Sequence, residues 1–198
     1  MRELTGKAGV NLGAINYHFG DKESLYLAMI KRLVQPINVA RLAKLKEAEQ
    51  AAGEKPVALD LIMEIYAGPL FTLCADNGTG GHHGIRLLGR SLAEPLPFVD
   101  PLVDEEFHGV TARFAQAIRR HVPHLAPDEF LWRLSFVVGA MQHTLATFHR
   151  MKELTRGICT SNDHPGALRR FIQFSVLTLT APTPPSPSKI GVAVSSSS

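Results

Sequence analysis

The stretch AGVNLGAINYHFGDKESLYLAMI, residues 8–30, decides the fold because it holds several helix boundaries within a short span. Gly9 and Gly20 are of the type that ends helices, while Asn11 and Asp21 are good N-caps. The pattern predicts a helical turn or two before Gly9, a short second helix to about Phe19, and a longer helix after Asp21. Two short helices joined by a sharp corner are typical of a helix-turn-helix.

The second short helix carries side chains that suit a nucleic acid. Its polar groups can donate to phosphate oxygens and base edges, and small residues beside them allow a close approach to a groove wall. Taken singly, Tyr17 and His18 are also what a half-buried helix would contain. Their spacing relative to Gly9, Phe19 and Gly20 favours DNA contact. The candidate contacts are Leu12, Gly13, Ala14, Asn16, Tyr17, His18 and Lys22.

The rest of the chain predicts an all-α fold, because helical periodicity is frequent and strand-like alternation is scarce. We expect Pro36 to kink or restart the third helix, Pro56 to open the next one, and Gly68-Pro69 to mark a possible kink. Expected helices thereafter cover 85–94, 101–122, 130–152 and 167–179. The expected organisation is a DNA-binding unit at 1–35, a helical domain at 36–181 and a Pro- and Ser-rich disordered tail at 182–198.

Composition narrows the class of protein only mildly. The chain has 198 residues, 45% hydrophobic and 20% charged, with a formal net charge of +3. That charge is compatible with nucleic-acid binding without requiring it. No apolar run approaches the ~20 residues of a membrane span and no leader-like segment opens the chain, so we expect a cytoplasmic protein. Cys74 and Cys159 are predicted to be buried, reduced thiols.

No motif predicts catalysis, a metal or a cofactor. The segment GTGGHHG has no strand before it, so it does not predict a dinucleotide loop. The nine histidines lack a spacing typical of metal ligands. No convergent set of titratable groups predicts an enzyme.

The motif AGV-N-LGAINYHFGDKESLYLAMI resembles the recognition region of the tetracycline-repressor (TetR) family. The resemblance implies that Leu12, Gly13 and Asn16 face bases, and that Ala14, Tyr17, His18 and Lys22 follow the phosphate backbone. It also implies a homodimer formed by the last two long helices, about 128–152 and 165–181, reading a palindromic operator in double-stranded DNA. NYHFGDKESLY followed by PINVARLAKL is similar to the subgroup that responds to fatty acids and drugs, which implies a small lipophilic effector that releases the repressor from DNA.

The chain departs from this family at its beginning, where the family has one more helix before the helix-turn-helix. Two explanations stay open. Met1 is an internal methionine of a longer natural protein, or the chain is truncated and its DNA binding is impaired. The second explanation carries an alternative function, a module that only dimerises or pairs with an intact relative.

The effector pocket is expected within the helical domain, lined by apolar and aromatic side chains. An ordinary helical core would use the same residues, so each assignment has a structural alternative. Arg86 and Arg90 lie one helical turn apart and could hold an acidic effector, or form an exposed pair with Glu94. The apolar candidates are Phe71, Phe98, Phe107, Phe114, Met141 and Phe148.

Overall fold

The computed structural model describes residues 21–75, 84–85, 88–89, 104–160 and 162–183. This part of the chain is helical without any strand, which confirms the all-α prediction. The candidate DNA contacts from Leu12 to His18 and the side chain of Lys22 lie outside the described residues, as do Arg86, Arg90, Phe98 and residues 184–198.

The helix α3, Lys22–Ala52, begins and ends as its capping residues predict. The Asp21 carboxylate accepts a hydrogen bond from the backbone N–H of Ser24 at 2.7 Å, which lowers the pKa of Asp21. Gly53 ends the helix with a φ of 62°, a conformation that favours glycine. The expected restart at Pro36 is wrong, because the helix continues through it. Burial of Val34 and Ile37 on either side compensates for the missing donor.

The helix α4, Leu59–Ala75, lies at the centre of the fold. It begins three residues after Pro56, contrary to prediction, and its first turn is closed by a hydrogen bond from the N–H of Ile62 to the carbonyl of Ala58. It continues through Pro69. Most of its surface is apolar, so it is stable only when other helices cover it. Its buried residues are Leu59, Ile62, Met63, Ile65, Tyr66, Ala67, Leu70, Phe71 and Cys74.

The helix expected at 101–122 starts, within the described residues, as a short π-helix, η1, Asp104–His108, and continues as α7, Gly109–Arg119. A π-helix widens the turn by one residue and shifts the carbonyls that face a neighbour. This local change was not predictable from apolar spacing, which is similar in both kinds of helix.

The two long helices expected near the C-terminus are α8, Pro127–Thr147, and α10, His164–Thr180. Their first residues lie within one residue of the starts that the resemblance implies, 128 and 165, and three residues before the starts expected from periodicity, 130 and 167. A proline in the first turn of each helix accounts for the earlier start. Between them lie η2, Phe148–Arg150, and α9, Met151–Leu154. The Asp163 carboxylate caps α10 through the N–H of Gly166 at 2.9 Å.

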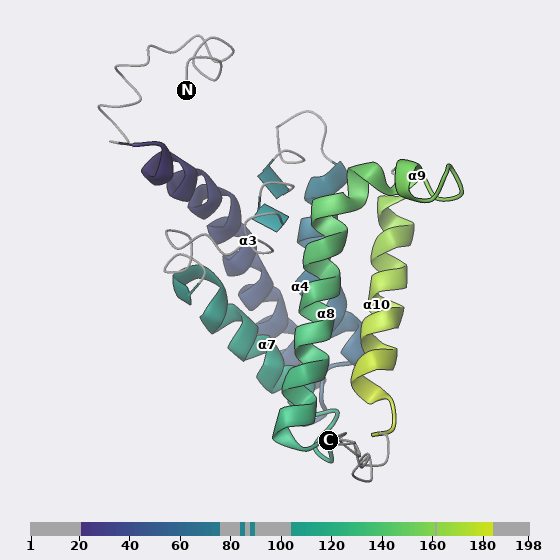
Figure 1. Cartoon of the computed structure of the whole chain (residues 1–198). Helices are drawn as coiled ribbons and strands as arrows, with labels where there is room; N and C mark the ends of the chain where they lie inside the picture. The colour runs from purple at the N-terminus through teal and green to yellow at the C-terminus, as the bar shows by residue number, and fades with distance from the viewer. Residues whose placement is uncertain (1–20, 76–83, 86–87, 90–103, 161, 184–198) are drawn as a thin grey trace, which may run out of the picture.

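The described helices form a bundle around α4 (Figure 1). In that view α8 is at the front, with α7 on its left and α10 on its right, and α4 passes behind. The first turns of α3 extend past the bundle at upper left. A search of the described helices finds no apolar segment of membrane-spanning length.

The two cysteines differ from prediction in one respect. Cys74 is buried in α4, as expected, but Cys159 is exposed in the connection between α9 and α10. Neither forms a disulfide. Cys159 is exposed because it lies in a non-helical segment, where no apolar helix face directs its side chain into the core.

The close approach of Gly89 to α8 gives a stability prediction. A Cβ at Gly89 would lie 2.9 Å from the backbone nitrogen of Ala146, so we expect Gly89→Ala to lower the free energy of unfolding by about 1–3 kcal/mol. Denaturant unfolding followed by circular dichroism measures this change. Gly109→Ala is the matched control, because a Cβ there meets nothing within 4 Å and the change should stay within about 1 kcal/mol. Equal losses in both variants would contradict the close approach.

Candidate effector site

A partly open cavity of about 230 Å³ lies where α3, α4, η1, α7 and α8 meet. Its walls are mainly apolar and aromatic, with a few polar groups, which is the composition of a small-molecule site. The described lining residues are Arg41, Tyr66, Leu70, Leu88, Phe107, His108, Thr111, Val138, Met141, Gln142 and Leu145.

Arg41 is the unexpected residue in this cavity. Its side chain is buried, with 2% of the residue exposed, and the guanidinium carbon lies 4.8 Å from the centre of the Tyr66 ring. Nη1 donates to the side-chain oxygen of Asn38 at 3.2 Å. Burial lowers the pKa of Arg41 to about 10, so the side chain keeps its positive charge at neutral pH.

A strip of polar side chains on α3 binds η1 and orders this side of the cavity. The amide nitrogen of Asn38 donates to the backbone carbonyl of Glu106 at 2.6 Å. The Glu106 carboxylate receives a hydrogen bond from Gln35 at 3.2 Å and pairs with Lys31 at 3.4 Å. Since Lys31, Gln35, Asn38 and Arg41 recur at helical spacing, one face of α3 both anchors η1 and reaches the cavity.

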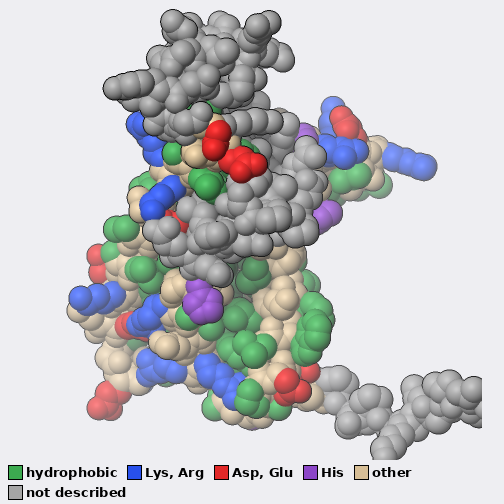
Figure 2. All heavy atoms as spheres, turned by 60° about the vertical axis from the view of Figure 1, so that its left-hand side comes forward, with side chains coloured by type: hydrophobic (Ala, Val, Ile, Leu, Met, Phe, Trp, Pro, Cys, Tyr) green, Lys and Arg blue, Asp and Glu red, His purple; other side chains and the backbone are tan. Residues whose placement is uncertain are grey.

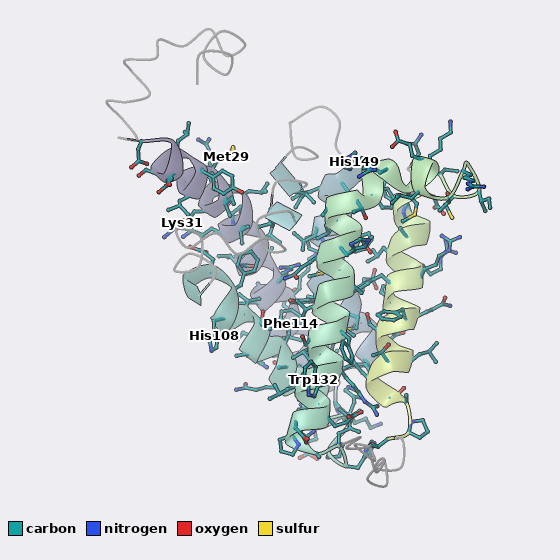
Figure 3. All side chains as sticks on the ribbon, in the orientation of Figure 1. Met29, Lys31, His108, Phe114, Trp132 and His149 are labelled. Carbon is teal, nitrogen blue, oxygen red and sulfur yellow. The ribbon has the colours of Figure 1, made fainter. Side chains whose placement is uncertain are left out.

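The predicted pocket residues are distributed over several places. Phe107 and Met141 line the cavity. Phe114 packs against Tyr66 with ring centroids 5.0 Å apart, beneath the cavity wall, and Figure 3 shows it near the middle of the bundle. Phe71 packs against Phe171 at 5.6 Å, between α4 and α10. Among the described candidates, the structure therefore brings Phe107 and Met141 together and places Phe71, Phe114 and Phe148 outside the cavity lining.

Phe148 lines a second, more open groove of about 500 Å³ between the upper part of α8, the α9–α10 connection and α10. Phe171 and Phe174 of α10 contribute apolar side chains to its lining, which also includes Cys159 and Asp163. This groove holds no buried charged side chain. It is consequently a weaker candidate for a specific ligand than the cavity at Arg41.

An apolar face on α8 and α10 remains uncovered. Trp132 is 62% exposed and stacks on Phe136 with ring centroids 5.8 Å apart. Leu177 on α10 is 70% exposed. Figure 3 shows Trp132 on the lower part of α8. Large exposed apolar side chains gathered on neighbouring helices are typical of protein interfaces. The exposed apolar residues of this face are Leu131, Trp132, Phe136, Phe174 and Leu177.

Charged side chains of both signs are interspersed at lower left in Figure 2. Within the ranges that the structure describes, no group of three metal-ligating side chains comes together.

Comparison with known families defines the class of protein. A family model described as "Tetracyclin repressor-like, C-terminal domain" matches residues 64–176, which is more than half of the chain. The matched segment includes most of α4, all of α7 and α8, and most of α10. The class is that of regulators with a helical ligand-binding domain, and the chain belongs to the tetracyclin repressor-like (TetR) family. No curated protein matches it in a sequence search.

The different surroundings of the two cysteines give a chemical prediction. Burial raises the pKa of Cys74 to about 12, so its reactive thiolate is scarce at pH 8, whereas Cys159 is exposed. We expect Ellman's reagent to modify one thiol per chain rapidly in the folded protein and both in denaturant. Cys159→Ser should abolish the rapid phase and Cys74→Ser should leave it unchanged. Rapid modification of both thiols in the folded protein would contradict the burial of Cys74.

Proposed function

We propose that this chain is a DNA-binding transcriptional repressor that acts as a homodimer and leaves a palindromic operator when a small lipophilic effector binds. The observation that carries the proposal is the cavity at Arg41, because α3 forms part of its wall and also leads back to the stretch that resembles a recognition helix. The membership of the chain in the TetR family supports the same reading.

The proposed coupling uses α3 as the connection between two sites. The helix runs without a break from Lys22, next to the candidate DNA contacts, to Arg41 in the cavity wall. At 1.5 Å per residue this distance is about 28 Å. A ligand that moves the Arg41 end of α3 would change the position of the DNA-binding end, and operator affinity would fall.

The proposed dimer uses the uncovered apolar face of α8 and α10. A second copy of the chain presents the same face, so a two-fold arrangement would bury Trp132 and Phe136 against their equivalents. Four helices would then pack as a bundle across the interface. The resemblance to the TetR family supports the same two helices.

The proposed DNA contacts are the residues that the resemblance implies, with Asn16 as the reader of a base. A carboxamide can pair through two hydrogen bonds with adenine, and each such pair contributes about 1–3 kcal/mol of discrimination. The proposal places Tyr17, His18 and Lys22 along the phosphates, where they would add affinity without sequence preference.

Fluorescence anisotropy tests the regulator proposal. The 198-residue chain is titrated onto labelled duplex from the region upstream of its own gene and onto a random duplex, at two salt concentrations. We expect tight binding to the first duplex that weakens as salt increases.

Asn16→Ala should reduce discrimination between the duplexes by about 10- to 100-fold. Gln50→Ala, at an exposed position near the other end of α3, is the matched control and should leave it unchanged. Equal weak binding to both duplexes would overturn DNA recognition by this chain.

Light scattering after size exclusion tests the dimer. We expect the wild-type chain to be dimeric and Trp132→Glu to be monomeric at micromolar concentration, because the carboxylate would be buried against a second copy. Leu154→Glu provides the control, since Leu154 is 55% exposed on α9, away from this face. A dimer that survives Trp132→Glu would place the interface elsewhere.

A further inference from the structure

Arg41, which lines the cavity, has unused hydrogen-bonding capacity. Its Nε and Nη2 atoms are buried and have no hydrogen-bond partner among the described residues. Nη1 is the guanidinium nitrogen that bonds to Asn38. The unpaired nitrogens, Nε and Nη2, form the edge of a guanidinium that binds a carboxylate through two parallel hydrogen bonds.

A second buried arginine of the same chain shows what a satisfied guanidinium looks like. Arg133 on α8 is also buried, with Nε bonded to the Glu129 carboxylate at 2.7 Å and Nη1 near the carbonyl oxygens that end α10. Its charge therefore has both a counter-ion and backbone acceptors. Arg41 has a single amide acceptor and the face of an aromatic ring.

Glu106, the acidic residue of η1 whose side chain the structure describes, does not compensate the charge of Arg41. Glu106 lies on η1, where its carboxylate pairs with Lys31 and accepts from Gln35. A buried charge that has no counter-ion among the described side chains is costly, because one amide oxygen and an aromatic ring replace only part of the hydration that the guanidinium loses. An anion that enters the cavity would supply both the charge and the acceptors that are missing.

The remaining walls and the size of the cavity restrict the ligand further. Apart from a few polar groups, the other described walls are apolar, with Leu70, Leu88, Met141 and Leu145 among the lining residues. A volume of about 230 Å³ corresponds to about eight water molecules at the density of the liquid. A ligand of about ten non-hydrogen atoms therefore fits, with one polar end and an apolar body.

We propose that the effector is a small amphiphilic monocarboxylate and that Arg41 selects it. The apolar body of the ligand occupies the cavity, and a shift of the side chains that cover the guanidinium lets Nε and Nη2 bind the carboxylate. This inference rests on the proposed function, and it specifies the charge and the size of the effector. One carboxylate matches the single charge of the guanidinium, whereas a dianion would bury one charge without compensation.

Isothermal titration calorimetry with matched ligand pairs tests the inference on the full chain. The pairs are octanoate with octanamide and benzoate with benzamide, which differ in charge but little in shape. We expect the wild-type protein to bind at least one carboxylate at least 10-fold more tightly than its amide. Arg41→Met should abolish this preference, and Arg41→Lys should retain only part of it because an ammonium lacks the planar fork.

Arg120→Met is the matched control, because Arg120 is exposed and bonds only to the Glu54 carbonyl among the contacts described. It should keep the wild-type preference. Thermal melts verify folding, and Arg41→Met should melt at or above the wild-type temperature because a buried charge is removed. Equal affinity for acid and amide, a preference that survives in Arg41→Met, or no binding of either carboxylate would each overturn the inference. Operator binding without ligand is measured separately, so loss of this inference does not imply loss of the proposed regulator.

Discussion

The coverage of α4 is the constraint on which the rest of the structure depends. This helix presents apolar side chains around most of its circumference, so it must be enclosed by other helices. α10 lies along one side of it, and α3, α7 and α8 close the others. The cavity lies beside Tyr66 and Leu70, where the neighbouring helices do not pack fully against α4. The same helix therefore holds the domain together and forms one wall of the candidate site.

The sequence predicted those helix boundaries that depend on residues close by in the chain. It did not predict the boundaries that depend on packing against other helices. The caps at Asp21 and Gly53 were predictable because a side chain or a backbone angle acts within a few residues. The continuation of α3 through Pro36 was not, because it depends on burial against other helices. The late start of α4 after Pro56 has the same origin, since buried Val57 packs before the first turn.

The cavity was predictable only in part. Phe107 and Met141 follow the apolar periodicity that any core would show, and nothing local distinguishes them from Phe114 or Phe71. Arg41 did leave a signal, because it takes the place of an apolar residue in the sequence Val34, Ile37, Arg41, Leu45 along one face of α3. A charged residue in such a series either pairs within the core or serves a ligand. Only the structure shows that, among the described side chains, the nearby carboxylate of Glu106 is engaged by Lys31 and does not pair with Arg41.

Pro36 lies between the two ends of α3 that the proposed function connects. Its ring removes one backbone hydrogen bond from the interior of the helix, so the rod has a soft point five residues before Arg41. The two halves of α3 can therefore change their mutual angle at Pro36 more easily than at a position where the hydrogen bond is intact. In the proposed coupling, an effector near Arg41 would act by setting this angle. The operator affinity would then depend on the bend of one helix as well as on its position.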